Sequence, residues 1–285
     1  MKTLIIGARG LVGSALKRKL KDAYEGIPVE PQKDKQFYVD ITKYETLFKA
    51  FSSIRPDIVY LPAAIAHVDK CEQSQGTEVV NVRGATTVLR LCESFESKLV
   101  YFSSSYVFNG TNPLPYSEND IPDPINNYGK QKQRVESLIL GSRVKNLIIR
   151  TVGVFGTERL KKNFAKQVIS AIFDGRKVFA PNDQFMNPIL SDDLARITIQ
   201  LASKQGGIWN VAGDTVMSKF QFAHHIASNF GLEKLVMPAS SSEMKQIAPR
   251  PSNASLSCSA VNNLGIETPS FTGGLTKFLS QEFNG

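Results

Sequence analysis

The chain has 285 residues, a formal net charge of +8, 42% hydrophobic residues and 21% charged residues, which is an ordinary composition for a globular protein. Its longest nearly apolar run, residues 58–66, is far shorter than the roughly 20 residues that cross a bilayer, and no secretory signal precedes the first glycine. The three cysteines lack a C-x-x-C spacing, which excludes a zinc ribbon and a disulfide framework. We therefore expect a cytoplasmic protein without a membrane partner.

The N-terminus combines a short apolar strand, residues 3–6, with a glycine-rich turn and a helical pattern. The turn reads Gly7-Ala8-Arg9-Gly10-Leu11-Val12-Gly13, with three glycines at a spacing of three. Strand, G-x-x-G-x-x-G and helix in this order are typical of a dinucleotide site, in which the first glycine permits the turn, the second admits a pyrophosphate and the third allows close packing. The turn residues Arg9, Leu11 and Val12 are expected to line this site.

The choice of nicotinamide cofactor depends on the next strand, which we expect at residues 27–30. Glu30 is a candidate for gripping an adenosine ribose. Arg9, Lys33 and Lys35 are cations that suit a 2′-phosphate, so the sequence favours NADPH, with NADH as the alternative. The positive net charge also fits such anionic partners.

Further cofactor contacts are expected where later elements meet the glycine turn. Asp40 and Ile41 begin a helical pattern, and Asp40 either caps that helix or lies against the adenine. Residues 57–61 form an apolar strand that ends at small residues, and Ala63 and Ala64 leave room for a flat cofactor. A long helix is expected over residues 77–95.

The stretch from residue 99 to residue 132 carries the predicted chemistry. An apolar strand, residues 99–102, ends at three serines, and the ends of parallel strands are where ligands bind in open α/β sheets. Tyr128 and Lys132 are four residues apart, so a helix capped by Asn126 or Asn127 presents them on one face. We expect the ammonium to lower the pKa of the phenol and Ser104 to hold a carbonyl.

Strands and helices alternate up to a fifth strand at residues 147–149, which predicts a Rossmann-like, doubly wound parallel sheet of the α/β class. We expect a dinucleotide-binding domain over residues 1–155 and a smaller α/β substrate domain over residues 156–285. In the second domain, residues 189–215 are expected to return to the sheet. Helices are expected near residues 163–173, 191–202, 218–230 and 275–283, with short irregular pieces at 178–179 and 183–186.

The glycine turn, Ser104, Tyr128 and Lys132 together resemble the extended short-chain dehydrogenases/reductases, in particular the dTDP-4-dehydrorhamnose reductases. Segments that are similar to this branch run through most of the chain, for example Val68-Asp69-Lys70-Cys71-Glu72 and Arg250-Pro251. The resemblance implies reduction of the 4-keto group of a nucleotide-linked 4-keto-6-deoxyhexose for surface polysaccharide synthesis.

The resemblance also implies roles for individual residues. Tyr128 would donate the proton, Lys132 would tune it and bind the nicotinamide ribose, and Ser104 would hydrogen-bond the carbonyl. The residues implied to contact the substrate are Lys70, Ser104, Ser105, Tyr106, Asn163, Gln184 and Arg250. A guanidinium suits diphosphate oxygens, which supports Arg250 independently. The magnesium carboxylates of the family have no match on this chain, so no metal ligands are assigned; a homodimer is considered.

Several alternatives stay open or are disfavoured. Ser105-Tyr106 replaces the Asp-Glu pair of a 4,6-dehydratase, and Ser105 replaces the cysteine that GDP-fucose synthases use for epimerisation. The resemblance extends to the regulatory subunit of methionine adenosyltransferase, which binds NADP without turning over a sugar. Short basic clusters without interleaved aromatics argue against a nucleic-acid partner.

Overall fold

The computed structural model describes residues 1–23, 39–158 and 163–283. At its centre lies a five-stranded sheet in which all neighbouring strands are parallel, in the order β1-β2-β3-β4-β9. This confirms the predicted α/β class with a parallel sheet. The strands are β1 (Thr3–Ile5), β2 (Ile58–Leu61), β3 (Lys98–Phe102), β4 (Asn146–Arg150) and β9 (Gly207–Asn210).

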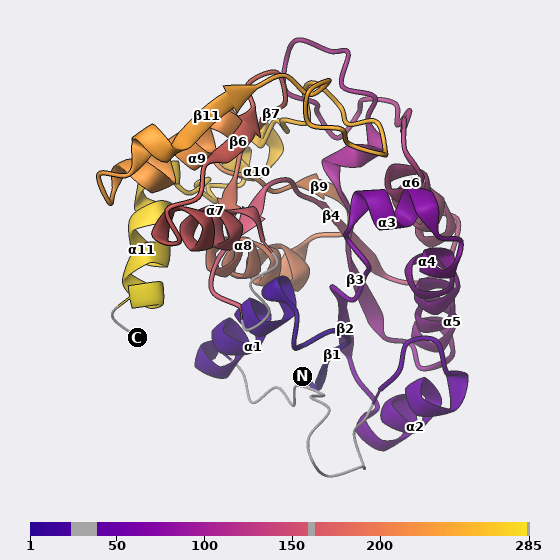
Figure 1. Cartoon of the computed structure of the whole chain (residues 1–285). Coiled ribbons are helices and arrows are strands. Elements are labelled where there is room, and N and C mark those ends of the chain that lie inside the picture. The colour runs from indigo at the N-terminus through magenta and orange to yellow at the C-terminus, as the bar shows by residue number, and fades with distance from the viewer. Residues whose placement is uncertain (24–38, 159–162, 284–285) are drawn as a thin grey trace.

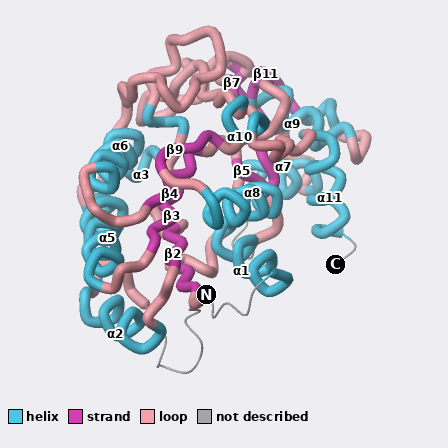
Figure 2. Tube along the Cα trace, turned by 180° about the vertical axis from the view of Figure 1, so that it is seen from behind, coloured by secondary structure: helices cyan, strands magenta, loops and turns pink. Residues whose placement is uncertain are grey.

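Helices cover both faces of this sheet (Figures 1 and 2). Successive strand residues point to opposite faces, so Ile148 packs into one apolar cluster, and Leu147 and Ile149 pack into another. The first cluster includes side chains of α2 (Tyr44–Ile54), α5 (Ala85–Ser94) and α6 (Asn127–Leu140). The second includes side chains of α1 (Leu11–Ala23) and α8 (Ser191–Lys204). The apolar runs of the strands are explained by this burial on two sides.

Two expectations about helices need correction. The helix expected over residues 77–95 is a continuous helical run of three parts, α4 (Gly76–Glu78), the π-helical η2 (Val79–Gly84) and α5. Asp40 caps no helix, because α2 begins four residues later after Lys43. Its carboxylate instead accepts hydrogen bonds from the Thr42 backbone N–H at 3.0 Å and the Thr42 hydroxyl at 2.7 Å, which closes a local turn.

A third apolar cluster consists mostly of side chains that follow β4, and Val107, Phe108 and Tyr116 from before β4 pack into it. The segments expected to be irregular at 178–179 and 183–186 contain strands, since β6 pairs in parallel with β11 and β7 pairs antiparallel with β10. The remaining elements are α3 (Val68–Gln73), η3 (Ser105–Val107), β5 (Val154–Phe155), α7 (Phe164–Phe173), β6 (Val178–Pro181), β7 (Phe185–Met186), β8 (Ile189–Leu190), β10 (Met217–Ser218), α9 (Lys219–Ser228), η4 (Glu233–Leu235), β11 (Val236–Ala239), α10 (Ser259–Asn263) and α11 (Phe271–Phe283).

The two parts of the chain interlock. β9 pairs with β4 along the central sheet, and α8 packs on α1, where Arg18 forms an ion pair with Asp192. The boundary at residues 155/156 stays a prediction. The strand expected at residues 27–30, with Glu30, Lys33 and Lys35, lies outside the described residues.

Candidate active site

The glycine turn joins β1 to α1 at the carboxyl end of the sheet. Gly7 has a φ of 102°, and a Cβ at this position would lie 2.8 Å from the backbone of Ala63. A Cβ on Gly13 would lie 2.1 Å from the Gly7 carbonyl oxygen, so both positions require glycine for packing. A Cβ on Gly10 would have only the Gly7 oxygen within 4 Å, at an ordinary 3.5 Å. The fold alone does not require glycine there.

The open space at Gly10, in contrast to the close packing at Gly7 and Gly13, bears on whether the turn can bind a dinucleotide. A free approach at Gly10 beside the N-terminus of α1 is what a pyrophosphate needs, because the helix offers unpaired N–H groups and a positive dipole end. Arg9 is exposed, Leu11 and Val12 are half-buried, and none of these three blocks the turn. The residues present therefore fit such a cofactor.

Of the other expected cofactor residues, Ala63 lies against the glycine turn, whereas Asp40 and Ile41 lie in the segment before α2. Ala63 donates its backbone N–H to the Ile6 carbonyl at 3.0 Å, and Ala63 and Ala64 are both half-buried. Ile41 packs against the helical run of η2, where a Cβ on Gly84 would lie 2.8 Å from its Cγ1. Hydrogen bonds from Thr42 hold the pKa of the Asp40 carboxyl below its usual value.

The predicted catalytic side chains come together where β3 ends beside α6. Asn126 caps α6, as one of the two expected candidates, by accepting the Gly129 N–H at 2.9 Å. One turn of helix then brings Tyr128 and Lys132 to the same face, and both are buried. Lys132 Nζ donates to the Phe102 carbonyl at 2.7 Å, directly before the serines. Ser104 follows two residues later, accepts the Tyr106 N–H at 3.2 Å, and lies close enough to the Tyr128 phenol to act on its pKa.

The electrostatics of this group differ from the expectation. Burial raises the pKa of the Tyr128 phenol, and the nearby Ser104 side chain opposes that increase without reversing it. The prediction that Lys132 lowers this pKa below its usual value is therefore wrong for the chain without a cofactor. Lys132 Nζ lies 5.8 Å from the centroid of the Tyr128 ring, but desolvation of the buried phenol is the largest effect on its pKa. Burial also lowers the pKa of Lys132 to about 8.

One residue that supports the site was missed by sequence reasoning. Asn81 lies in η2, is buried, and accepts the Ile65 N–H at 2.7 Å. Its amide nitrogen donates to Ile65 O at 3.0 Å and to Gln131 Oε1 at 2.7 Å, so it joins the loop after β2 to the residue before Lys132. The sequence signal that could have identified Asn81 is its place as a polar residue on the apolar side of a predicted helix, because a buried polar side chain needs hydrogen-bond partners.

Ser103, Ser105 and Tyr106 flank Ser104 in the chain. Ser105 is fully buried, and the described part of the chain offers no hydrogen-bond partner to its Oγ or to the hydroxyls of Ser103 and Thr151. Tyr106 is half-buried, and its ring meets that of Tyr128 edge-on with centroids 6.1 Å apart. Direct contact of Ser105 with a substrate would require movement of its surroundings.

The remaining expected substrate residues come from three separate segments. Asn163 caps α7 and donates to the Gly156 carbonyl at 2.9 Å. Gln184 is buried, accepts from Lys219 Nζ at 2.6 Å and donates to Gln246 at 2.7 Å. Lys70 is exposed on α3. The guanidinium of Arg250 is bound by Asp69 of that helix at 2.9 Å.

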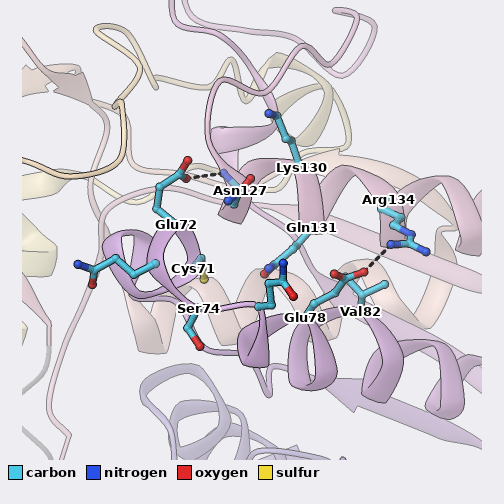
Figure 3. A pocket seen from close by; sticks show the side chains of 11 residues that line it. Cys71, Glu72, Ser74, Glu78, Val82, Asn127, Lys130, Gln131 and Arg134 are labelled. Carbon is cyan, nitrogen blue, oxygen red and sulfur yellow. Dashed lines mark hydrogen bonds and ion pairs between the residues drawn. The ribbon is translucent and has the colours of Figure 1, made fainter.

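A pocket of about 410 Å³ lies between α3, α4, η2 and the outer side of α6 (Figure 3). Glu72 accepts the Asn127 N–H there at 2.9 Å, and Arg134 pairs with Glu78 at 2.6 Å. Ser104, Tyr128 and Lys132 are absent from its lining, so this pocket neighbours the catalytic group without containing it. Within the described ranges, no helix is long and apolar enough to span a membrane, and no three His, Cys, Asp and Glu side chains gather as they would to bind a metal.

Comparisons with known proteins agree with this geometry. A curated relative, the spore coat polysaccharide biosynthesis protein SpsK of Bacillus subtilis, is 31% identical over 98% of this chain and 97% of its own. Methionine adenosyltransferase 2 subunit beta of Mus musculus is 29% identical over 95% of this chain and 85% of its own. A crystal structure of dTDP-4-dehydrorhamnose reductase from Bacillus anthracis in complex with NADP superposes with a TM-score of 0.90 at 29% identity, over 98% of this chain and 99% of that chain.

The model of the family described as RmlD substrate binding domain matches residues 1–283, which is nearly the whole chain. The match includes the glycine turn and the predicted catalytic residues, and it extends through the C-terminal helix α11. The resemblance inferred from the motifs is thus confirmed at the level of the family. The chain belongs to the RmlD family, the extended short-chain dehydrogenases/reductases of the dTDP-4-dehydrorhamnose reductase type.

Proposed function

We propose that the chain is an NADPH-dependent reductase of the 4-keto group of a dTDP-linked 4-keto-6-deoxyhexose, acting in the cytoplasm in surface polysaccharide synthesis. The observation that carries this proposal is the convergence of Ser104, Tyr128 and Lys132 at the end of β3. The named functions of SpsK and of the reductase from Bacillus anthracis support the sugar class. The three buried free cysteines support a reducing compartment.

The residues of the chain divide the reaction between them. A bound nicotinamide supplies a hydride to the carbonyl carbon. Tyr128 donates its phenolic proton to the carbonyl oxygen, and Ser104 donates a hydrogen bond to the same oxygen. Because burial raises the pKa of Tyr128, the phenol stays protonated at neutral pH and is ready to neutralise an alkoxide, a much stronger base. Lys132 donates a hydrogen bond to the Phe102 carbonyl and would hold its positive charge near the carbonyl oxygen of the substrate.

The cofactor is proposed to lie along the glycine turn. Gly10 admits the pyrophosphate, Arg9 faces a 2′-phosphate, and Ala63 and Ala64 flank the flat rings. NADP in the homologous structure supports NADPH over NADH. The proposed preference for NADPH is tested by comparing the dissociation constants of NADPH and NADH.

The nucleotide sugar is proposed to occupy the space between α6 and the C-terminal part of the chain. Arg250 and Lys70 would face its diphosphate, while Tyr106, Asn163 and Gln184 would surround the sugar and base. Ser105 is fully buried and would reach the sugar only if its surroundings moved. Whether two copies act together as a homodimer stays a prediction, which sedimentation of the purified protein would decide.

The decisive experiment follows the loss of NADPH absorbance with a panel of nucleotide-linked 4-keto-6-deoxyhexoses. Turnover with dTDP-linked substrates is expected, with slower or no turnover for other bases. A chain that binds NADPH but reduces no member of the panel would contradict the proposal.

A second candidate function is that of a non-catalytic NADP-binding regulatory subunit. Its specific support is the 29% identity to methionine adenosyltransferase 2 subunit beta over most of both chains. This function predicts tight NADPH binding, no sugar turnover and an effect on a separately purified methionine adenosyltransferase. The complete serine, tyrosine and lysine set favours the reductase.

A further inference from the structure

A loop that we call the strap, residues 240–250, links the C-terminal part of the chain to the catalytic side of the sheet. Near its start, Asp183 accepts the Ser241 N–H and hydroxyl at 2.9 and 2.8 Å. At its far end, the Pro249 carbonyl accepts from Asn126, the cap of α6, at 2.9 Å. Figure 1 shows the orange loop after β11 reaching toward α6. The strap is therefore hydrogen-bonded to the N-terminal cap of the helix that carries Tyr128.

Asp69 of α3 is the second anchor of this far end. Its Oδ1 accepts the Ala248 N–H at 3.0 Å and lies 2.9 Å from Arg250 Nη2. Arg250 Nη1 in turn donates to the Ala248 carbonyl at 2.6 Å. One carboxylate thus fixes both the backbone of the strap and the end of its arginine side chain, which is only 10% exposed.

The charge state of Asp69 agrees with this arrangement. Partial burial works to raise the pKa of the carboxyl, but hydrogen bonds from Ala248 and Arg250 and the charge of Arg250 hold it below its usual value. Asp69 is therefore ionised at neutral pH. Removing this carboxylate would leave the guanidinium of Arg250, which is only 10% exposed, without its charge partner, so the stability of Asp69 variants has to be measured beside their binding.

The guanidinium of Arg250 has five N–H groups. Among the described residues, Nη1 donates to the Ala248 carbonyl and Nη2 pairs with Asp69, so the other N–H groups can donate to phosphate oxygens. A free arginine side chain loses much rotamer entropy when it is ordered, and a preformed anchor removes part of that cost before the ligand arrives.

We propose that Asp69 is a positioning residue that orients Arg250 and the strap for the diphosphate of the nucleotide sugar. The inference deepens the proposed function and rests on it. Asp69 does not contact the reacting atoms; it acts through Arg250. Its effect is therefore expected on nucleotide binding and on the KM of the sugar substrate, with kcat and NADPH affinity unchanged.

The test measures dTDP binding by calorimetry, independent of turnover, together with KM, kcat and NADPH affinity. Asp69→Ala is expected to weaken dTDP binding and raise KM by roughly tenfold or more, while kcat and the NADPH dissociation constant stay within about twofold. Asp69→Asn, which keeps an acceptor for Ala248, is expected to lose less. The double variant with Arg250→Ala is expected to bind dTDP no more weakly than Arg250→Ala alone.

Asp174→Asn is the matched control, because Asp174 forms an exposed ion pair with Arg176 and should leave every readout unchanged. Thermal unfolding of each variant separates misfolding from altered binding. If Asp69→Ala binds dTDP as tightly as the wild type or more tightly, the carboxylate is neutral or competes with the ligand, and the inference is overturned. If the wild type itself binds no dTDP, the proposed function fails, and the role of Asp69 fails with it.

Discussion

Arg150 at the end of β4 grips Glu136 of α6 through two hydrogen bonds, Nε to Oε1 at 3.0 Å and Nη2 to Oε2 at 2.7 Å. Both side chains are almost fully buried, at 2% and 3% exposure. Glu136 lies one turn beyond Lys132, so the pair fixes the catalytic helix against the sheet. Breaking one partner of such a pair leaves an uncompensated charge in the interior.

Glu136→Gln is accordingly expected to lower the free energy of unfolding by about 3–5 kcal/mol, because the Arg150 charge loses its partner. Urea unfolding followed by circular dichroism measures this. The control is Glu78→Gln, which breaks the exposed pair with Arg134 and should cost no more than about 1 kcal/mol. Equal losses for the two variants would show that burial does not decide the cost.

Tyr128→Phe removes the proposed proton donor and keeps the ring. We expect kcat to fall by about a hundredfold to ten-thousandfold with NADPH affinity within about twofold of the wild type. Steady-state turnover and cofactor fluorescence measure the two quantities. Tyr44→Phe, on an exposed ring, is the control and should leave both unchanged. Undiminished turnover by Tyr128→Phe would remove the phenol from the mechanism.

Gly10→Ala and Gly13→Ala should separate cofactor binding from folding. The Cβ added at Gly10 meets only an ordinary contact, so the melting temperature should barely change while NADPH affinity falls by roughly tenfold or more, because the pyrophosphate loses its approach. The Cβ added at Gly13 collides with Gly7, so this variant should lose stability by about 1–3 kcal/mol. Normal NADPH binding by Gly10→Ala would contradict the proposed cofactor position.

The buried ammonium of Lys132 gives stability a defined pH dependence. Its pKa falls from 10.5 to about 8 on folding, so between these values the unfolded chain binds more protons and stability rises with pH. Relative to Lys132→Met, the wild type should therefore gain roughly 2–3 kcal/mol of unfolding free energy between about pH 7 and about pH 10. Urea unfolding at a series of pH values measures the difference.

Lys130→Met supplies the control for this pH dependence, because Lys130 lies on the same helix with its side chain exposed. If the difference between Lys132→Met and the wild type stays constant with pH, the folded chain binds the Lys132 proton as tightly as the unfolded chain does.

Local patterns predicted much of this molecule. The apolar strands near residues 3–6, 57–61, 99–102 and 147–149, the Asn126 cap and the helix starting after Ser218 follow from short-range chemistry, and the structure has them. The partnership of Arg150 with Glu136 and the bridge from Asn81 to Gln131 depend on how β4, η2 and α6 pack, which no local period encodes. The predicted direction of the shift in the Tyr128 pKa was wrong for a related reason. Residue spacing reveals a neighbouring charge but not how deeply the phenol is buried.

The strand β9 has a consequence for any attempt to divide the chain. It arrives more than fifty residues after β4, yet it supplies the hydrogen-bonding partner along that strand from Leu147 to Arg150. A fragment ending at residue 155 would expose a bare row of amides and carbonyls, and the apolar side of α1 would lose the cover of α8. Such a fragment should aggregate, which makes the N-terminal half of the chain dependent on the C-terminal half for its solubility.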